Sequence, residues 1–151
     1  MPSQRELIRM TDDEVAAFLA ERRTLHVATL NRDGSPHLVP MYFLVVDGRV
    51  AFWTYTKSQK IRNLHRDPRI TVMVEDGEAY GELRGVQIAG RAELTSDPAL
   101  VAAFGERLFP RYFGPLDEAA RAYVASAAAK RTLVTVHPTR VVSWDHRRLG
   151  G

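Results

Sequence analysis

Hydrophobic and polar positions alternate with two different periods along the chain, and each period predicts a different kind of element. Val15, Phe18 and Leu19 recur at helical spacing after a Thr11-to-Glu14 capping box, so a helix is predicted over about 11–22. Further helices are predicted over 58–66, 98–109 and 117–130. Short apolar runs predict strands over 25–30, 37–46, 49–54, 69–75, 81–94 and 133–144.

Turn residues separate these elements. Asn31-Arg32-Asp33-Gly34 and Asp47-Gly48 are typical of hairpin turns. Asp67-Pro68 ends the helix over 58–66, because the residue before proline disfavours helical geometry. Gly85 and Gly90 predict bends or bulges within the long fifth strand, and His137-Pro138 predicts a break in the last one.

The order of the elements indicates the fold class. About six strands are joined mainly by tight turns, and the helices fall at the ends of the strand series. This order predicts an α+β fold built on an antiparallel barrel, whereas a doubly wound parallel sheet needs strands and helices to alternate. The chain has 151 residues and no internal repeat or linker, so one domain over 1–151 is expected.

Composition excludes several kinds of chemistry. The chain has no cysteine, which removes disulfides, thiolate catalysis and sulfur-based metal sites. The five histidines share no close spacing, so no metal site is expected. No apolar run approaches the roughly 20 residues that cross a bilayer, and the N-terminus carries no apolar signal core. We therefore expect a cytoplasmic protein without a membrane partner.

The basic residues are unevenly divided between lysine and arginine. Of the 21 basic residues only Lys57, Lys60 and Lys130 are lysines, and the formal net charge is +3. A pI near 9.5 suits nucleic-acid binding, but the arginines are scattered among acidic residues and form no basic tail. We expect no nucleic-acid partner.

Two of the three lysines lie at a predicted helix start. An apolar strand ends at Phe52-Trp53, and Ser58 then opens the helix between Lys57 and Lys60. Free helix N–H groups, the helix dipole and two ammonium groups together favour an anion. Ser58 is also an ordinary N-cap, so a capped surface helix with solvated lysines is the alternative.

A resemblance to a known family supports the anion site. The resemblance rests on an ordered series of segments, namely 25–30, 33–37, 39–41, 52–54, 57–60, 63–64, 67–69, 90–92 and 142–144. In this series the chain resembles the pyridoxamine-5'-phosphate-oxidase-like, FMN-binding split barrels. Within them it resembles the F420 (deazaflavin)-dependent oxidoreductases, so the resemblance implies a Greek-key split β-barrel with peripheral helices.

The same resemblance implies a homodimer whose two sites are shared between protomers. It places the cofactor ring against the backbone of strand two and the strand that follows, and the phosphate at the helix start. The partner chain then closes over the ring. The implied cofactor-binding residues are Val39, Pro40, Met41, Trp53, Thr54, Lys57, Ser58, Lys60, Asn63, and, from the partner, Gln87 and Trp144. Trp53 is equally suited to the core.

The resemblance further implies an oxidoreductase in which reduced F420 delivers hydride to a conjugated, electron-poor small molecule, such as a tetrapyrrole (biliverdin), quinone or enone. A hydride carrier supplies its own reactivity, so no catalytic side chain is assigned. Two alternatives remain: an FMN-dependent oxidase or reductase, and a non-catalytic binder of flavin, deazaflavin or haem. Arg62, Arg66 and Arg69 either meet the acidic tail of F420 or form a solvated helix face.

Overall fold

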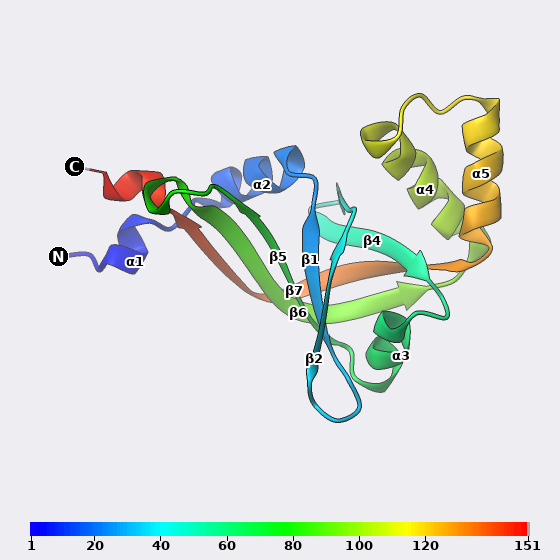
Figure 1. Cartoon of the computed structure of the whole chain (residues 1–151), viewed down its shortest axis with the longest axis horizontal. Coiled ribbons are helices and arrows are strands. Elements are labelled where there is room, and N and C mark those ends of the chain that lie inside the picture. Colours follow the sequence, from blue (N-terminus) through cyan, green and yellow to red (C-terminus); the bar gives the residue numbers. More distant parts are fainter. Residues whose placement is uncertain (151) are drawn as a thin grey trace.

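The computed structural model describes residues 1–150, and its centre is one curled antiparallel sheet (Figure 1). The seven strands lie in the order β2-β1-β5-β6-β7-β4-β3, and every neighbouring pair is antiparallel. Their bounds are β1 Leu25–Leu30, β2 Pro36–Met41, β3 Leu44–Val46, β4 Arg49–Tyr55, β5 Arg69–Asp76, β6 Arg84–Thr95 and β7 Arg131–Asp145. The predicted α+β split barrel is thus confirmed.

Helices gather at the ends of this sheet, as Figure 1 shows. The short helix α1 lies with the C-terminal turn η2 at one end, and α4 packs with α5 at the other. The helix α3 follows β4 directly. The bounds are α1 Gln4–Leu7, α2 Asp12–Glu21, α3 Gln59–Arg66, η1 Tyr80–Glu82, α4 Pro98–Tyr112, α5 Glu118–Ala128 and η2 His146–Leu149. In residues 1–150 no helix is long and apolar enough to cross a membrane.

Two apolar clusters fill the interior. The larger one lies inside the barrel and includes the fully buried Leu25, Phe43 and Phe52. The smaller one lies between the sheet and α4, where Ala51, Phe104 and Leu108 are buried and Trp53 packs against them. Strand β4 serves both clusters, because successive side chains on a strand point to opposite faces.

The predicted strand over 37–46 is two strands in the structure. The chain turns at Tyr42-Phe43, so β2 and β3 become the two edges of the sheet and the barrel is split between them. Phe43 is buried there, where no neighbouring strand pairs with its backbone. The hydroxyl of Tyr112 accepts from the Phe43 N–H at 3.2 Å and donates to the Phe43 carbonyl at 2.8 Å. One side chain from α4 therefore satisfies both backbone groups at the split.

Other predicted boundaries also change. Strand β7 runs through His137-Pro138 instead of breaking, and the β6–β7 register shifts between Ala89 and Gly90. The shift confirms the predicted bulge at Gly90, where a Cβ would lie 2.2 Å from the His137 carbonyl oxygen. Helix α4 continues past Phe109 to Tyr112, because a proline in the last turn removes only one helical hydrogen bond. The short elements α1, η1 and η2 were not predicted.

Candidate functional site

The N-terminus of α3 is an open donor site. Ser58 is its N-cap: its hydroxyl accepts from the Ile61 N–H at 3.4 Å, and its own N–H donates to the Tyr55 carbonyl. Within residues 1–150 the N–H groups of Gln59 and Lys60 have no acceptor. The first turn therefore presents free N–H groups and the positive end of the helix dipole to an incoming anion.

The two lysines beside this turn carry unpaired charge. Neither Lys57 nor Lys60 forms an ion pair with any residue in 1–150. Lys57 is exposed, whereas Lys60 is partly buried, and this burial lowers the pKa of its ammonium group. A partly buried cation without an acidic neighbour is destabilising, and a bound anion would offset that cost. We refer to Lys57, Ser58 and Lys60 as the lysine site.

The neighbouring strand start adds a residue that the sequence did not indicate. Arg131 pairs with Tyr55 across β4 and β7, and its guanidinium lies 4.3 Å from the centroid of the Tyr55 ring. It also lies 5.0 Å from the Trp53 ring and donates to the Ala127 carbonyl. No sequence signal marks Arg131, because only the strand register brings it beside the turn that carries Lys57.

Trp53 is partly buried and Thr54 is buried. The Trp53 indole packs against α4: its ring centroid is 6.3 Å from that of Phe104, and a Cβ on Gly105 would come within 2.4 Å of it. Its side chain is thus a packing residue, in line with the core alternative. Thr54 is 5% exposed and faces the opposite side of β4. At these two positions a ligand could contact the backbone of β4 but not the Trp53 indole.

Asn63 has no free hydrogen-bonding group. Its side chain is fully buried and donates to the Thr29 hydroxyl and the Asn31 amide oxygen, each at 3.0 Å. Its own amide oxygen accepts from Gln59 at 2.8 Å and from Arg66 at 3.1 Å. Asn63 therefore holds α3 against β1 and the following turn, and supports the lysine site without being open to a ligand.

The three predicted ring-lining residues of β2 lie on an edge strand. Val39, Pro40 and Met41 pair with β1 on one side only, opposite Val27, His26 and Leu25. Val39 and Met41 are half-buried and Pro40 is exposed. The free edge leaves backbone groups of β2 available, and Pro40 contributes no N–H to it.

Gln87 and Trp144 lie far from the lysine site in the same chain. Tyr55, just before Lys57, pairs with the first residue of β7, whereas Trp144 is almost the last. At roughly 3.3 Å per residue, about 40 Å of strand separates Arg131 from Trp144. The indole covers Gly85, where a Cβ would be 2.1 Å from it. Gln87 lines a groove of about 650 Å³ near Arg5, Arg9 and Arg140.

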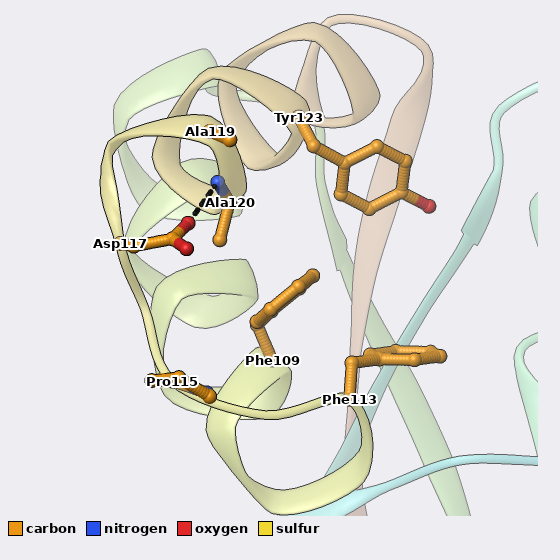
Figure 2. A pocket seen from close by; sticks show the side chains of 7 residues that line it. All are labelled: Phe109, Phe113, Pro115, Asp117, Ala119, Ala120 and Tyr123. Atoms are coloured by element: carbon orange, nitrogen blue, oxygen red, sulfur yellow. Dashed lines mark hydrogen bonds between the residues drawn. The ribbon is translucent and has the colours of Figure 1, made fainter.

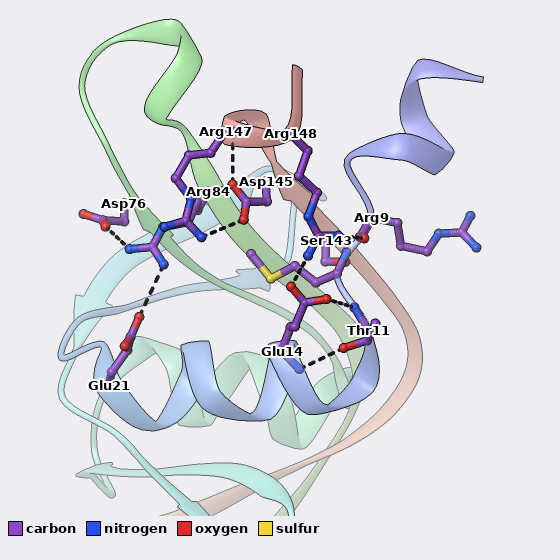
Figure 3. Close-up of polar contacts among 11 residues, drawn as sticks. Arg9, Thr11, Glu14, Glu21, Asp76, Arg84, Ser143, Asp145, Arg147 and Arg148 are labelled. Carbon is purple, nitrogen blue, oxygen red and sulfur yellow. Dashed lines mark hydrogen bonds and ion pairs between the residues drawn. The ribbon is translucent and has the colours of Figure 1, made fainter. Parts of the chain in front are cut away.

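A network of ion pairs holds the strand end that carries Trp144 (Figure 3). Arg148 pairs with Glu14, Arg147 with the buried Asp145 at 2.8 Å, and Arg84 with Asp76 at 2.7 Å. The Arg147 guanidinium lowers the pKa of the Asp145 carboxyl, and that of Arg84 lowers the pKa of Asp76. We call this network the terminal clasp; its members are Glu14, Glu21, Asp76, Arg84, Asp145, Arg147 and Arg148.

A basic groove of about 650 Å³ runs along the exposed face of α3. It is lined by Arg32 from the β1–β2 turn and by Gln59, Arg62, His65 and Arg66. Arg66 donates to the Leu30 carbonyl and to Asn63, and Arg69 is bound to Asp67 at 2.7 Å outside the groove. Of the three arginines singled out from the sequence, Arg62 is therefore the one without an acidic or carbonyl partner in residues 1–150.

Comparison with known proteins identifies the scaffold. The family model for pyridoxamine 5'-phosphate oxidase matches residues 11–145. The conserved hypothetical protein Rv2991 from Mycobacterium tuberculosis is 40% identical over 99% of this chain and 94% of that one, with a TM-score of 0.92. An F420 reductase is 28% identical over 93% and 98%, with a TM-score of 0.67.

More distant structures share the fold alone. The heme storage protein HutZ from Vibrio cholerae is 18% identical over 87% of this chain and 93% of that one, with a TM-score of 0.67. A search of curated proteins found no match. The family match spans the lysine site, β2 and all of β7. The chain therefore belongs to the pyridoxamine 5'-phosphate oxidase-like family of split barrels.

Proposed function

We propose that this protein is an F420-dependent oxidoreductase that reduces a conjugated, electron-poor small molecule. The lysine site carries the proposal. Two ammonium groups stand at the N-terminus of α3, and neither they nor the N–H groups of Gln59 and Lys60 have a partner among residues 1–150. This donor set suits a phosphate, because it combines point charges with aligned N–H groups.

The basic groove favours a deazaflavin over FMN. F420 carries an acidic lactyl-oligoglutamate arm beyond its phosphate, whereas FMN ends at the phosphate. The groove begins at Gln59, one residue after the N-cap, and continues past Arg62 toward Arg32. An arm leaving the lysine site along α3 would meet these cations. The likeness to an F420 reductase at 28% identity points the same way. An FMN enzyme, which would use the same phosphate contacts, is the second candidate.

A homodimer is part of the proposal. Gln87 and Trp144 are expected to close over the cofactor ring, yet the strand register holds them far from the lysine site of their own chain. A second copy would supply them. The lysine site, β2 and β4 of one protomer would then face the groove that contains Gln87 on the other.

The residues of this chain bind and orient the cofactor rather than react. Bound F420 would supply the hydride chemistry, and the proton that the reduced acceptor needs would come from solvent. The lysine site anchors one end of the cofactor, and the free edge of β2 presents backbone to the ring. Asn63 keeps α3 in place through its four hydrogen bonds. A quinone, an enone or a tetrapyrrole such as biliverdin fits this role as acceptor.

Parallel titration of apo-protein with F420 and with FMN, read by fluorescence, tests the cofactor assignment. We expect F420 to bind at least tenfold more tightly, with a preference that weakens as salt rises, because the groove contacts are exposed ion pairs. Tighter binding of FMN would replace the deazaflavin proposal with its FMN alternative. Binding of neither would refute both.

Turnover separates an enzyme from a carrier. Reduced F420 is mixed with the protein and with menadione or biliverdin, and oxidation of the cofactor is followed by absorbance. Oxidation well above the uncatalysed rate supports a reductase. Tight binding with no acceleration for any acceptor would identify a non-catalytic cofactor binder.

A further inference from the structure

A second cavity, which is shallow and open to solvent, lies between the end of α4 and the start of α5, away from the lysine site. Figure 2 shows its walls: Phe109, Phe113 and Tyr123 surround an opening of about 440 Å³ whose remaining lining is Pro115, Asp117, Ala119 and Ala120. That volume lies within the range of small-molecule sites. Helix α5 separates the cavity from Arg131, and its 11 residues span about 16 Å at 1.5 Å per residue. The cavity is thus distinct from the proposed cofactor phosphate site.

The aromatic rings of the cavity leave their faces accessible. Phe109 lies 5.3 Å from Phe113 and 6.0 Å from Tyr123, at interplanar angles of 40° and 56°. Rings tilted in this way do not cover one another. Phe113 is 57% exposed and Tyr123 is 51% exposed, so part of each ring is open to a ligand. The open faces carry the negative part of the ring quadrupole, which attracts a cation or an electron-poor ring.

One charged group lines this cavity, and it is negative. Asp117 accepts from the Ala120 N–H at 2.8 Å through one carboxylate oxygen, as the dashed line in Figure 2 shows. It forms no ion pair with any residue in 1–150. The second oxygen therefore remains available to a ligand. Aromatic faces beside an unpaired carboxylate complement a ligand that is both flat and positively charged.

We propose that this cavity binds a planar aromatic cation, such as a protonated heteroaromatic amine. The ligand would stack on Phe109 and Phe113 and direct its charge toward Asp117. The cavity is formed wholly by the α4–α5 hairpin. The site therefore does not depend on the cofactor, and its test needs none.

The test is a fluorescence titration of the full chain, without cofactor, with the planar cation proflavine. Anilinonaphthalene sulfonate serves as the aromatic anion. We expect Asp117→Asn to weaken proflavine binding by about 3- to 10-fold without weakening the anion, while asparagine still caps α5. Phe113→Leu keeps apolar volume but removes the aromatic ring, and it should weaken proflavine binding to a similar degree.

Tyr80→Leu is the control, because Tyr80 is a well-exposed aromatic outside the cavity, with its ring 4.6 Å from that of His146 in the C-terminal turn. It should leave proflavine binding unchanged. Equal loss in Tyr80→Leu, or unchanged binding in both cavity variants, would overturn the proposal. So would a Phe113→Leu protein that changes oligomeric state by light scattering, since the rings would then be an interface between copies of this chain.

Discussion

Two charged regions of the molecule differ in how their charges are satisfied. In the terminal clasp every arginine has a carboxylate within the chain: Arg84 has Asp76, Arg147 has Asp145, and Arg148 has Glu14. In the lysine site neither ammonium group has an acidic partner in residues 1–150, although Lys60 is partly buried.

This difference in pairing distinguishes charges that stabilise the fold from charges that are free to bind a ligand. A paired charge has its interaction already made, and removing one partner lowers stability. An unpaired cation at a helix N-terminus opposes the helix dipole and slightly destabilises the fold, and its favourable interaction forms only when an anion arrives. The same chemistry therefore predicts opposite phenotypes for substitutions in the two regions.

The largest effect is expected at the lysine site. The double substitution Lys57→Gln and Lys60→Gln should weaken F420 binding by about 100-fold or more, because each hydrogen bond to a charged group contributes roughly 1.5–3 kcal/mol. Thermal stability should stay near that of the unsubstituted protein. Fluorescence titration and a melting curve measure the two quantities.

Arg49→Gln is the control, since Arg49 is an exposed cation without an acidic partner in residues 1–150 and lies at the opposite end of β4, about 20 Å of strand from Tyr55. It should change cofactor affinity by less than threefold. Undiminished binding in the double variant would remove the lysine site from the proposed function.

The second-largest effect is expected at Asn63, which holds α3 in place but is buried and has no group free to bind a ligand. Asn63→Ala leaves Thr29, Asn31 and Gln59 without their common partner, and should lower the free energy of unfolding by about 2–3 kcal/mol. Urea unfolding measures the loss. An unchanged midpoint would show that these four hydrogen bonds contribute nothing net.

The terminal clasp gives a pH-dependent prediction. The pKa of the Asp145 carboxyl is lowered by Arg147, so its stabilising contribution is present above the usual aspartate pKa near 3.9 and is lost as pH falls below it. Asp145→Asn should therefore cost about 1.5 kcal/mol at pH 7, as expected for one hydrogen bond to a charged group. The difference between the two proteins should shrink toward pH 3.

Chemical denaturation at pH 7, 5 and 3 measures this difference. A stability difference that stays constant over this range would show that Asp145 does not act through its charge.

The smallest effect is expected in the basic groove. Arg62→Gln should weaken F420 binding by only about 3- to 10-fold, because an exposed ion pair contributes little. It should weaken FMN binding by less than twofold, because FMN has no acidic arm. Arg69→Gln is the control, since Arg69 is bound to Asp67. Equal losses for both cofactors would place Arg62 at the phosphate instead.

Local patterns predicted most of the elements. The capping box beginning at Thr11 marks a helix that the structure bounds at Asp12–Glu21, and Asp47-Gly48 forms the predicted hairpin turn with positive φ at both residues. Two predictions were wrong, namely that strand two extends over 37–46 and that the last strand breaks at His137-Pro138. Both depend on distant partners: Tyr112 holds Phe43 at the split, and β6 pairs with β7 on both sides of His137-Pro138.

The site was predicted in part. Lys57, Ser58 and Lys60 are adjacent in sequence, so a strand-to-helix pattern was enough to group them. Asn63 and Trp53 could not be assigned in this way. Asn63 is held inside the protein by Thr29, and Trp53 packs against Gly105. Both partners lie far away in the sequence, so local patterns could not show that these two side chains are buried contacts.

The sequence alone determined what short-range physics decides: the approximate places of most strands and helices, that they form an antiparallel α+β fold, and that cations stand at the start of α3. The tertiary structure decided which charges remain unpaired, because pairing joins residues as far apart as Glu14 and Arg148. It also placed Arg131 beside Tyr55 and separated Trp144 from the lysine site, since register along β7 sets both.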